Sequence, residues 1–242
     1  MKTSASKANA TEQLPLVVGI GASAGGLEAL QQFFSCMPGN SGLIFIIIQH
    51  LSPDYKSLMA EILGKHTSMM VLQTESGMEI EPDTVYLIPP KKNMTLKDGR
   101  LFLTDSIHGS INHPIDIFFS SLAEERRERA LAVIFSGTGS DGTNGIKTIK
   151  EHGGFVLVQD PQSAKFDGMP RSAINTGLAD VILPPDKLAE EILNIANYPA
   201  LAIPQESPHS FPDEDTLARI YSILKKARGI DFTHYKRNTV LR

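Results

Sequence analysis

The feature that most constrains this chain is a pattern that occurs twice: an apolar run, a glycine-rich loop, and then apolar residues at helical spacing. The first copy runs from Leu16 to Ile20, breaks at Gly21 to Gly26 and continues at helical spacing as far as Met37. The second has the apolar run Leu131 to Phe135 and the loop Ser136 to Gly142. Repeated strand-loop-helix units predict a mostly parallel sheet with helices on both faces.

The segments between and after these two copies continue the alternation. Apolar runs predict further strands and amphipathic segments predict further helices. Asp98-Gly99 lies between two short extended segments, a strong signal for a tight hairpin turn, whereas the sequence around Ser76 is irregular and polar. We therefore expect an α/β fold with strands at 43–48, 85–88, 155–158 and 181–183, and helices at 57–63, 114–129, 170–175 and 186–196, besides one through Ile146 and Ile149.

Composition excludes several functional classes. The net charge is −4 in 242 residues, so there is no overall basic field for nucleic acid. No apolar run approaches the ~20 residues that a membrane span needs, and the first 15 residues lack the apolar stretch of a signal peptide. The single cysteine, Cys36, cannot form an internal disulfide and is expected to be a small buried hydrophobe. A cytoplasmic protein without a membrane span is expected.

The sequence also predicts how the chain is divided. Residues 1–15 are expected to be a disordered leader, and residues 16–196 form the α/β domain. Residues 197–212 contain four prolines among polar residues, which is typical of an extended linker. Residues 213–242 begin with a further helix, acidic at its start and basic at its end, and are expected to be the start of a second domain or a docking segment.

The first glycine-rich loop fits two functional templates. One is G-x-S-x-G centred on Ser23, which is typical of a serine nucleophile, and the other is the dinucleotide fingerprint G-x-G-x-x-A on Gly19, Gly21 and Ala24. A dinucleotide site needs an acidic residue near the end of the second strand, and Gln49-His50 stand there instead. A P-loop fails because Leu27-Glu28 stand where lysine and serine or threonine are needed.

The nucleophile hypothesis gains partners elsewhere in the chain. Ser23, His50 and Asp141 each follow a predicted parallel strand, so they are expected to meet in one crevice. A serine hydroxyl needs a neutral imidazole to take its proton, and the imidazole needs a carboxylate to orient it. The order Ser, His, Asp differs from the Ser, Asp, His order of α/β-hydrolases.

Structural alternatives stand beside each of these assignments. Ser23 could cap the following helix, His50 could be a polar strand end, and Asp141 could cap the helix after it. His113 is the next candidate for the base, and no histidine pair has metal-ligand spacing, so we expect no metal.

The chain resembles the bacterial chemotaxis protein-glutamate methylesterases, in their catalytic domain, from about Leu16 to Ala196. The resemblance rests on six blocks in order: 21–26, 49–50, 77–78 with 85–87, 113–116, 136–142 and 166–171. It implies a doubly wound sheet with an antiparallel edge hairpin, and a nucleophile, base and orienting carboxylate at Ser23, His50 and Asp141. The implied reaction removes methyl esters from glutamate side chains of methylated chemoreceptors, with glutamine deamidation at the same site and no cofactor.

The resemblance also places Ala24, Thr138 and Met169 on the oxyanion and substrate side. The family usually has threonine and methionine at the first two of these positions, so substrate contacts are expected to differ. Residues 220–239 resemble the start of a receptor glutamate methyltransferase, which implies a methyltransferase domain in cis in a fused sensory protein. We expect these 242 residues not to include the family's usual receiver domain. An adaptor domain without esterase activity is the alternative function, and a nucleotide-binding domain ranks third.

Overall fold

The computed structural model describes residues 15–49, 58–106, 112–197, 214–229 and 235. Its centre is a seven-stranded sheet in the order β10-β9-β8-β1-β2-β5-β3, and all its strand pairs are parallel. The strands are β1 (Val17–Ala22), β2 (Ile44–Gln49), β3 (Met70–Gln73), β5 (Thr84–Leu87), β8 (Ala130–Ile134), β9 (Phe155–Gln159) and β10 (Val181–Leu183). The expected parallel sheet is confirmed.

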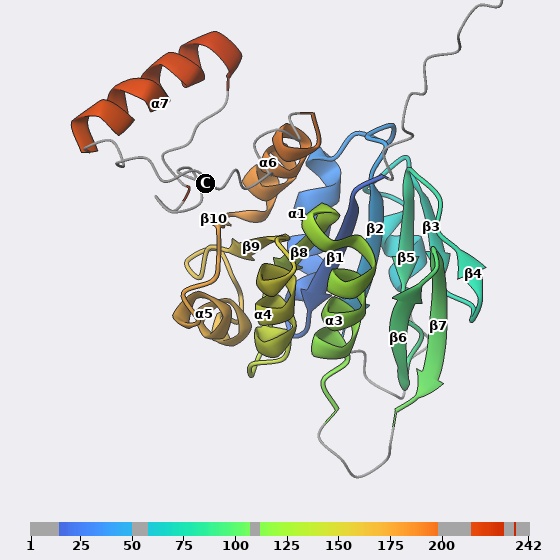
Figure 1. Cartoon of the computed structure of the whole chain (residues 1–242). Helices are drawn as coiled ribbons and strands as arrows, with labels where there is room; N and C mark the ends of the chain where they lie inside the picture. The colour runs from blue at the N-terminus through green and yellow to red at the C-terminus, as the bar shows by residue number, and fades with distance from the viewer. Residues whose placement is uncertain (1–14, 50–57, 107–111, 198–213, 230–234, 236–242) are drawn as a thin grey trace, which may run out of the picture.

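Helices cover both faces of this sheet (Figure 1). One apolar cluster joins the sheet to α1 (Gly26–Cys36), α2 (Met59–Leu63) and α6 (Pro185–Asn197). The other joins it to α3 (Pro114–Arg126), α4 (Thr143–Glu151) and α5 (Gly168–Asn175), and a short 3₁₀ turn, η1 (Arg127–Arg129), follows α3. Because side chains alternate along a strand, β1 sends Val18 and Ile20 into the first cluster and Val17 into the second. The doubly wound fold is confirmed.

The hairpin forms as expected but belongs to a small sheet of its own. Strands β6 (Lys92–Lys97) and β7 (Arg100–Asp105) pair antiparallel, and Asp98 and Gly99 both have positive φ (50° and 70°), as a type I′ turn requires. The hairpin binds β4 (Met78–Glu79) rather than a strand of the large sheet. In addition, the Leu96 N–H donates to the Ser121 hydroxyl of α3 at 3.0 Å, so the hairpin packs beside α3.

One strand was not predicted, and one local expectation was wrong. The polar sequence at Ser76 and Gly77 lies in a turn, as expected, but β3 precedes it at the edge of the large sheet, with residues that are exposed or half-buried. Cys36 is exposed rather than buried. Phe33, Phe34 and Met37 fill the inward positions at this end of α1, and Cys36 lies about 200° around the helix axis from Phe34.

The carboxyl-terminal segment contributes α7 (Glu214–Arg228) and Tyr235. Tyr235 makes an isolated antiparallel bridge with Val181 of β10, and its hydroxyl donates to the Glu191 carboxylate of α6. Burial, followed by the charge of Glu191, raises the pKa of Tyr235. Residues 230–234, between α7 and Tyr235, lie outside the described part of the chain, and so does the predicted linker except for its first residue, Asn197, which ends α6. None of the described helices is long and apolar enough to cross a membrane.

Candidate active site

The strand order turns at β1, and this is where the candidate residues gather. β1 pairs with β2 on one side and with β8 on the other. The strands of this sheet that follow β1 in sequence, as far as β5, extend it on the β2 side, and the strands from β8 onward extend it on the other side. The switch point therefore lies between β1 and β8 in the sheet. In open α/β sheets, ligands bind outside the carboxyl ends of the strands at such a switch point. The Ser23 turn follows β1 and the Ser136–Gly142 loop follows β8, so they flank this point.

Ser23 lies in the tight turn between β1 and α1, as the sequence predicted. Its N–H donates to the Ser136 carbonyl at 3.0 Å, and its own carbonyl accepts from the Gly26 N–H at 2.9 Å. Gly25, with φ 71°, is the N-cap residue of α1, and no side chain caps the helix. The Ser23 hydroxyl makes no hydrogen bond within the described residues. Ser23 therefore does not cap α1, which was the structural alternative to a nucleophile.

Gln49 marks the end of the neighbouring strand. The register of β1 and β2 places Gln49 opposite Ala22, the residue before Ser23. His50 follows Gln49 in the sequence but lies outside the described residues. Its assignment as the base therefore stays a prediction.

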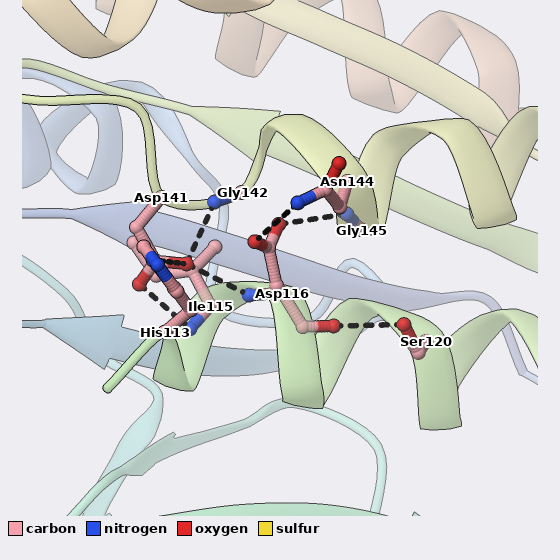
Figure 2. A network of polar contacts seen from close by, with 8 residues as sticks. All are labelled: His113, Ile115, Asp116, Ser120, Asp141, Gly142, Asn144 and Gly145. Carbon is pink, nitrogen blue, oxygen red and sulfur yellow. Dashed lines mark hydrogen bonds and ion pairs between the residues drawn. The ribbon is translucent and has the colours of Figure 1, made fainter. Parts of the chain in front are cut away.

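Asp141 is a buried carboxylate in the loop between β8 and α4, only 5% exposed. Its oxygens accept hydrogen bonds from three backbone N–H groups: Ile115 at 3.0 Å, Asp116 at 3.1 Å and Gly142 at 2.8 Å (Figure 2). Ile115 and Asp116 lie in the first turn of α3, where N–H groups lack partners within the helix and the helix dipole favours negative charge. The structure therefore holds Asp141 in a site built for an ionised carboxylate.

α3 also connects Asp141 to the end of β1. A Cβ on Gly21 would lie 2.6 Å from the Ile115 side chain, so only glycine lets α3 approach this closely, two residues before Ser23. A Cβ on Gly142 would lie 2.9 Å from the same side chain. Ile115 thus fills the space between the end of β1 and the start of α4, and its N–H donates to Asp141.

His113 is the described histidine that lies beside this carboxylate. Its Nδ1 is 3.7 Å from an Asp141 oxygen, and its side chain is 45% exposed (Figure 2). His113, Asp116 and Asp141 offer ligand atoms within 4.8 Å of one another, a spacing that a metal ion could use. However, four backbone N–H groups already point at the two carboxylates, and their positive ends oppose a cation. The arrangement suits an orienting carboxylate better than a metal centre.

Asp116 makes the reciprocal contact: Asp141 binds the start of α3, and Asp116 binds the start of α4. It belongs to the first turn of α3, and its carboxylate accepts from the Gly145 N–H in the first turn of α4 at 2.7 Å (Figure 2). Asp141, just before α4, binds the first turn of α3 in exchange. The alternative role expected for Asp141, capping the helix after it, is taken mainly by Asp116. Sequence reasoning missed this exchange, although Asp116 lies in a block that carries the resemblance.

The loop after β8 lies against Ser23. A Cβ on Gly137 would come within 2.9 Å of the Ser23 Cβ and 2.1 Å of the Met169 sulfur, so glycine is required there. Met169 is 1% exposed, and its N–H donates to the Gly137 carbonyl at 2.9 Å. Its side chain therefore packs behind the loop rather than on the surface.

Among the described residues, the backbone N–H groups of Ala24 and Thr138, in the two loops beside Ser23, have no acceptor, and neither do those of Gly25 and Gly139. The Gly137 N–H, in contrast, already donates to the Phe166 carbonyl at 2.9 Å. Of the three residues expected on the oxyanion and substrate side, Ala24 and Thr138 thus offer free donors and Met169 supports the loop between them.

Comparisons with known proteins agree with this geometry. Residues 18–192 match the family model described as CheB methylesterase. The chain belongs to the CheB methylesterase family. The crystal structure of the Thermotoga maritima CheB methylesterase catalytic domain superposes with a TM-score of 0.69 at 30% identity, covering 75% of this chain and 98% of that one. The expected membership and fold are confirmed.

Two curated relatives add context. A protein-glutamate methylesterase/protein-glutamine glutaminase of Desulfotalea psychrophila is 35% identical over 185 residues, which is 74% of this chain and 51% of the relative. A Rhodobacter capsulatus protein named "Uncharacterized 104.1 kDa protein in hypE 3′ region" is 38% identical over 205 residues, 76% of this chain and 22% of the relative. The chain therefore spans about half the length of the first of these relatives and less than a quarter of the second.

Proposed function

We propose that this domain hydrolyses γ-methyl esters of glutamate side chains on chemoreceptors, with Ser23 as nucleophile, His50 as base and Asp141 as orienting carboxylate. The observation that carries the proposal is the meeting of three strand ends. The Ser23 turn and the Asp141 loop follow the adjacent strands β1 and β8, and the β2 register sets Gln49, which precedes His50, opposite Ala22, which precedes Ser23. Membership of the CheB methylesterase family supports the same chemistry.

The proposed reaction has two steps. His50 in its neutral form takes the Ser23 proton as the serine oxygen attacks the ester carbonyl, and the proton then passes to the departing methoxide, which leaves as methanol. Water, activated by the same histidine, hydrolyses the acyl-serine and returns a glutamate carboxylate. General base catalysis of this kind contributes about 10²- to 10⁴-fold.

The oxyanion formed in each step needs donors close to Ser23. We assign this role to the N–H groups of Ala24 and Thr138, which flank the nucleophile and have no acceptor among the residues that the structure describes. A donor of this kind is worth about 10²- to 10³-fold in kcat. Because backbone N–H groups do not depend on the side chain, alanine and threonine serve here as well as other residues.

Two further activities or partners belong to the same proposal. Attack on a glutamine carboxamide would release ammonia by the same steps, and the relatives are named protein-glutamine glutaminases as well as methylesterases. The similarity of residues 220–239 to the start of a receptor methyltransferase supports a methyltransferase domain in cis. The chain covers 22% of the 104.1 kDa relative, so a domain of this family does occur within a much longer chain.

The test is methanol release from a methylated chemoreceptor. The Ser23→Ala variant should release none above background, while Ser35→Ala, which removes an exposed hydroxyl at the far end of α1, should match the unaltered protein. Labelling by a serine-reactive fluorophosphonate should modify Ser23 alone. Methanol release by Ser23→Ala would refute the assignment of the nucleophile, and an unaltered domain that neither labels nor releases methanol would favour an adaptor.

A further inference from the structure

Ser136 connects three separate segments around the nucleophile. It lies one residue past Phe135 after β8 and is completely buried. Its carbonyl accepts from the Ser23 N–H at 3.0 Å, and its own N–H donates to the Gln159 side chain at the end of β9, at 2.8 Å. Its hydroxyl lies 2.8 Å from the Ala24 carbonyl and 3.0 Å from the Phe166 N–H. Every polar group of this one residue is therefore used to hold the surrounding loops.

The direction of the hydroxyl proton follows from the neighbouring contacts. The Ser136 oxygen accepts from the Phe166 N–H and has a single proton to donate. Two carbonyls are in reach, that of Ala24 at 2.8 Å and that of Phe166 at 3.2 Å. The Phe166 carbonyl already accepts from the Gly137 N–H at 2.9 Å. The proton is accordingly assigned to the shorter contact, with Ala24.

These contacts fix the peptide groups on both sides of the nucleophile. The peptide before Ser23 is held through its N–H, and the peptide after Ala24 is held through its carbonyl, both by Ser136. Because peptide groups are planar, the remaining peptide between Ser23 and Ala24 has little freedom. That peptide carries the Ala24 N–H assigned to the oxyanion. The Ser23 turn also packs directly against the Ser136 hydroxyl, since a Cβ on Gly25 would lie 2.7 Å from the Ser136 Oγ.

We propose that Ser136 is a positioning residue for the reaction: it sets the Ser23 oxygen and the Ala24 N–H in their reactive geometry without touching substrate. This inference rests on the proposed function. Loss of the hydroxyl leaves the Ala24 carbonyl and the Phe166 N–H without their partner, so the turn relaxes. Displacements of about 1 Å in a reacting group can cost on the order of 10²-fold in rate. The effect should fall on kcat, since the surface that binds substrate is unchanged.

The experiment compares Ser136→Ala with Ser121→Ala in the full chain. Ser121 is a matched control because its hydroxyl also donates to one carbonyl (Phe118, 2.9 Å) and accepts from one N–H (Leu96, 3.0 Å), but it joins α3 to the hairpin. We expect Ser136→Ala to lower kcat for methanol release and the rate of fluorophosphonate labelling by about 10- to 100-fold, with KM within about threefold. Ser121→Ala should leave all three unchanged.

Further readouts separate positioning from a loss of folding. Hydrogen exchange at the Ser23 N–H should accelerate in Ser136→Ala and not in Ser121→Ala. Ser136→Cys, which keeps a weaker donor and acceptor, should fall between the alanine variant and the unaltered protein, and it replaces the alanine variant if that fails to fold. A folded Ser136→Ala protein with kcat and labelling within threefold of the unaltered protein would overturn the proposal, as would an equal loss in Ser121→Ala.

The two proposals fail in distinguishable ways. If the unaltered protein labels at Ser23 but releases no methanol, the proposed function fails, and the labelling rates of the variants decide the role of Ser136. If the unaltered protein does not label at all, Ser23 is not a reactive nucleophile and both proposals fail.

Discussion

Asp116 and Asp141 make the same kind of contact and differ in what else lies near them. Each accepts backbone N–H groups from the first turn of a helix, Asp141 from α3 and Asp116 from α4. Asp141, however, is buried at the carboxyl end of the central strands and has His113 3.7 Å away. The Asp116 carboxylate accepts its other hydrogen bond within the described residues from the Asn144 side chain, at 3.4 Å. A capping bond therefore does not argue against a catalytic role, and the location of the carboxylate separates the two aspartates.

The sharpest test of this comparison is to neutralise each carboxylate in turn. Asp141→Asn should lower kcat by about 10³- to 10⁴-fold, because the histidine loses the charge that orients it. Asp116→Asn should leave kcat within about threefold, since its partners lie in α4. Steady-state methanol release measures both, and similar losses in the two variants would mean that Asp141 acts only by holding α3.

The second test asks which histidine Asp141 serves. His50→Gln should lower kcat by about 10²- to 10⁴-fold as the general base is lost. His113→Gln, which changes the described neighbour of Asp141, should stay within about fivefold, with circular dichroism confirming that both variants are folded. The opposite ranking would make the network of Figure 2 the complete acid-base site and would displace His50.

The pH dependence gives a third, smaller effect. The base must be neutral to take the Ser23 proton, and an unperturbed histidine has a pKa of about 6.5. Below that pH, kcat/KM should fall about tenfold per pH unit as the base becomes protonated. Asp116→Asn should leave this profile in place, so a shifted profile in that variant would show that Asp116 also acts on the base.

Stability should distinguish the two aspartates less than activity does. Asp141→Asn removes a charge that binds three N–H groups in a buried site, so the free energy of unfolding should fall by about 2 to 3 kcal/mol. Asp116→Asn weakens one such bond and should cost about 1 kcal/mol. Urea unfolding measures both, and an equal cost would indicate that the extra N–H groups at Asp141 contribute nothing to folding.

Glu28 is an exposed carboxylate that contrasts with the two aspartates. Removing its partner, Lys165, should have the smallest effect on the free energy of unfolding among these tests. The hydrogen bond from Lys165 lowers the pKa of Glu28 below its ordinary value of 4.5. A lowered pKa stabilises the fold above the unfolded value, and this contribution is lost as the pH falls through the folded value. Both side chains are more than half exposed, so Lys165→Met should cost under about 1 kcal/mol at pH 7 and less than that at pH 3. Urea unfolding at the two pH values checks this, and a cost that does not decrease between pH 7 and pH 3 would have another cause.

The local elements of the fold could be predicted because their signals are local. The apolar run from Leu16 predicted β1, the run from Leu131 predicted β8, and Asp98-Gly99 predicted the hairpin. Edge strand β3 was not predicted, because its four residues are exposed or half-buried and show no clear alternation of apolar and polar side chains. The sequence did not show that β4, β6 and β7 form a sheet of their own, because strand pairing depends on long-range packing, here against α3.

The candidate site could be predicted only in part for the same reason. Strand-end positions named Ser23 and Asp141, and the structure sets both at the switch point of the sheet. Spacing could not reveal that Asp116 and Asp141 exchange helix partners, or that Ser136 holds the Ser23 turn. Each of those contacts joins residues more than 20 positions apart, and no sequence period encodes them.

The exchange between Asp116 and Asp141 also has a consequence for motion. Because each helix start supplies the acceptor for the other, opening one end releases the N–H groups of both, so the two first turns should open as a single cooperative unit. Hydrogen exchange at Ile115, Asp116 and Gly145 should then share one rate. Any fluctuation that frays the first turn of α3 would break its hydrogen bonds to Asp141 at the same moment. The domain would then switch between an active and an inactive conformation rather than lose activity gradually.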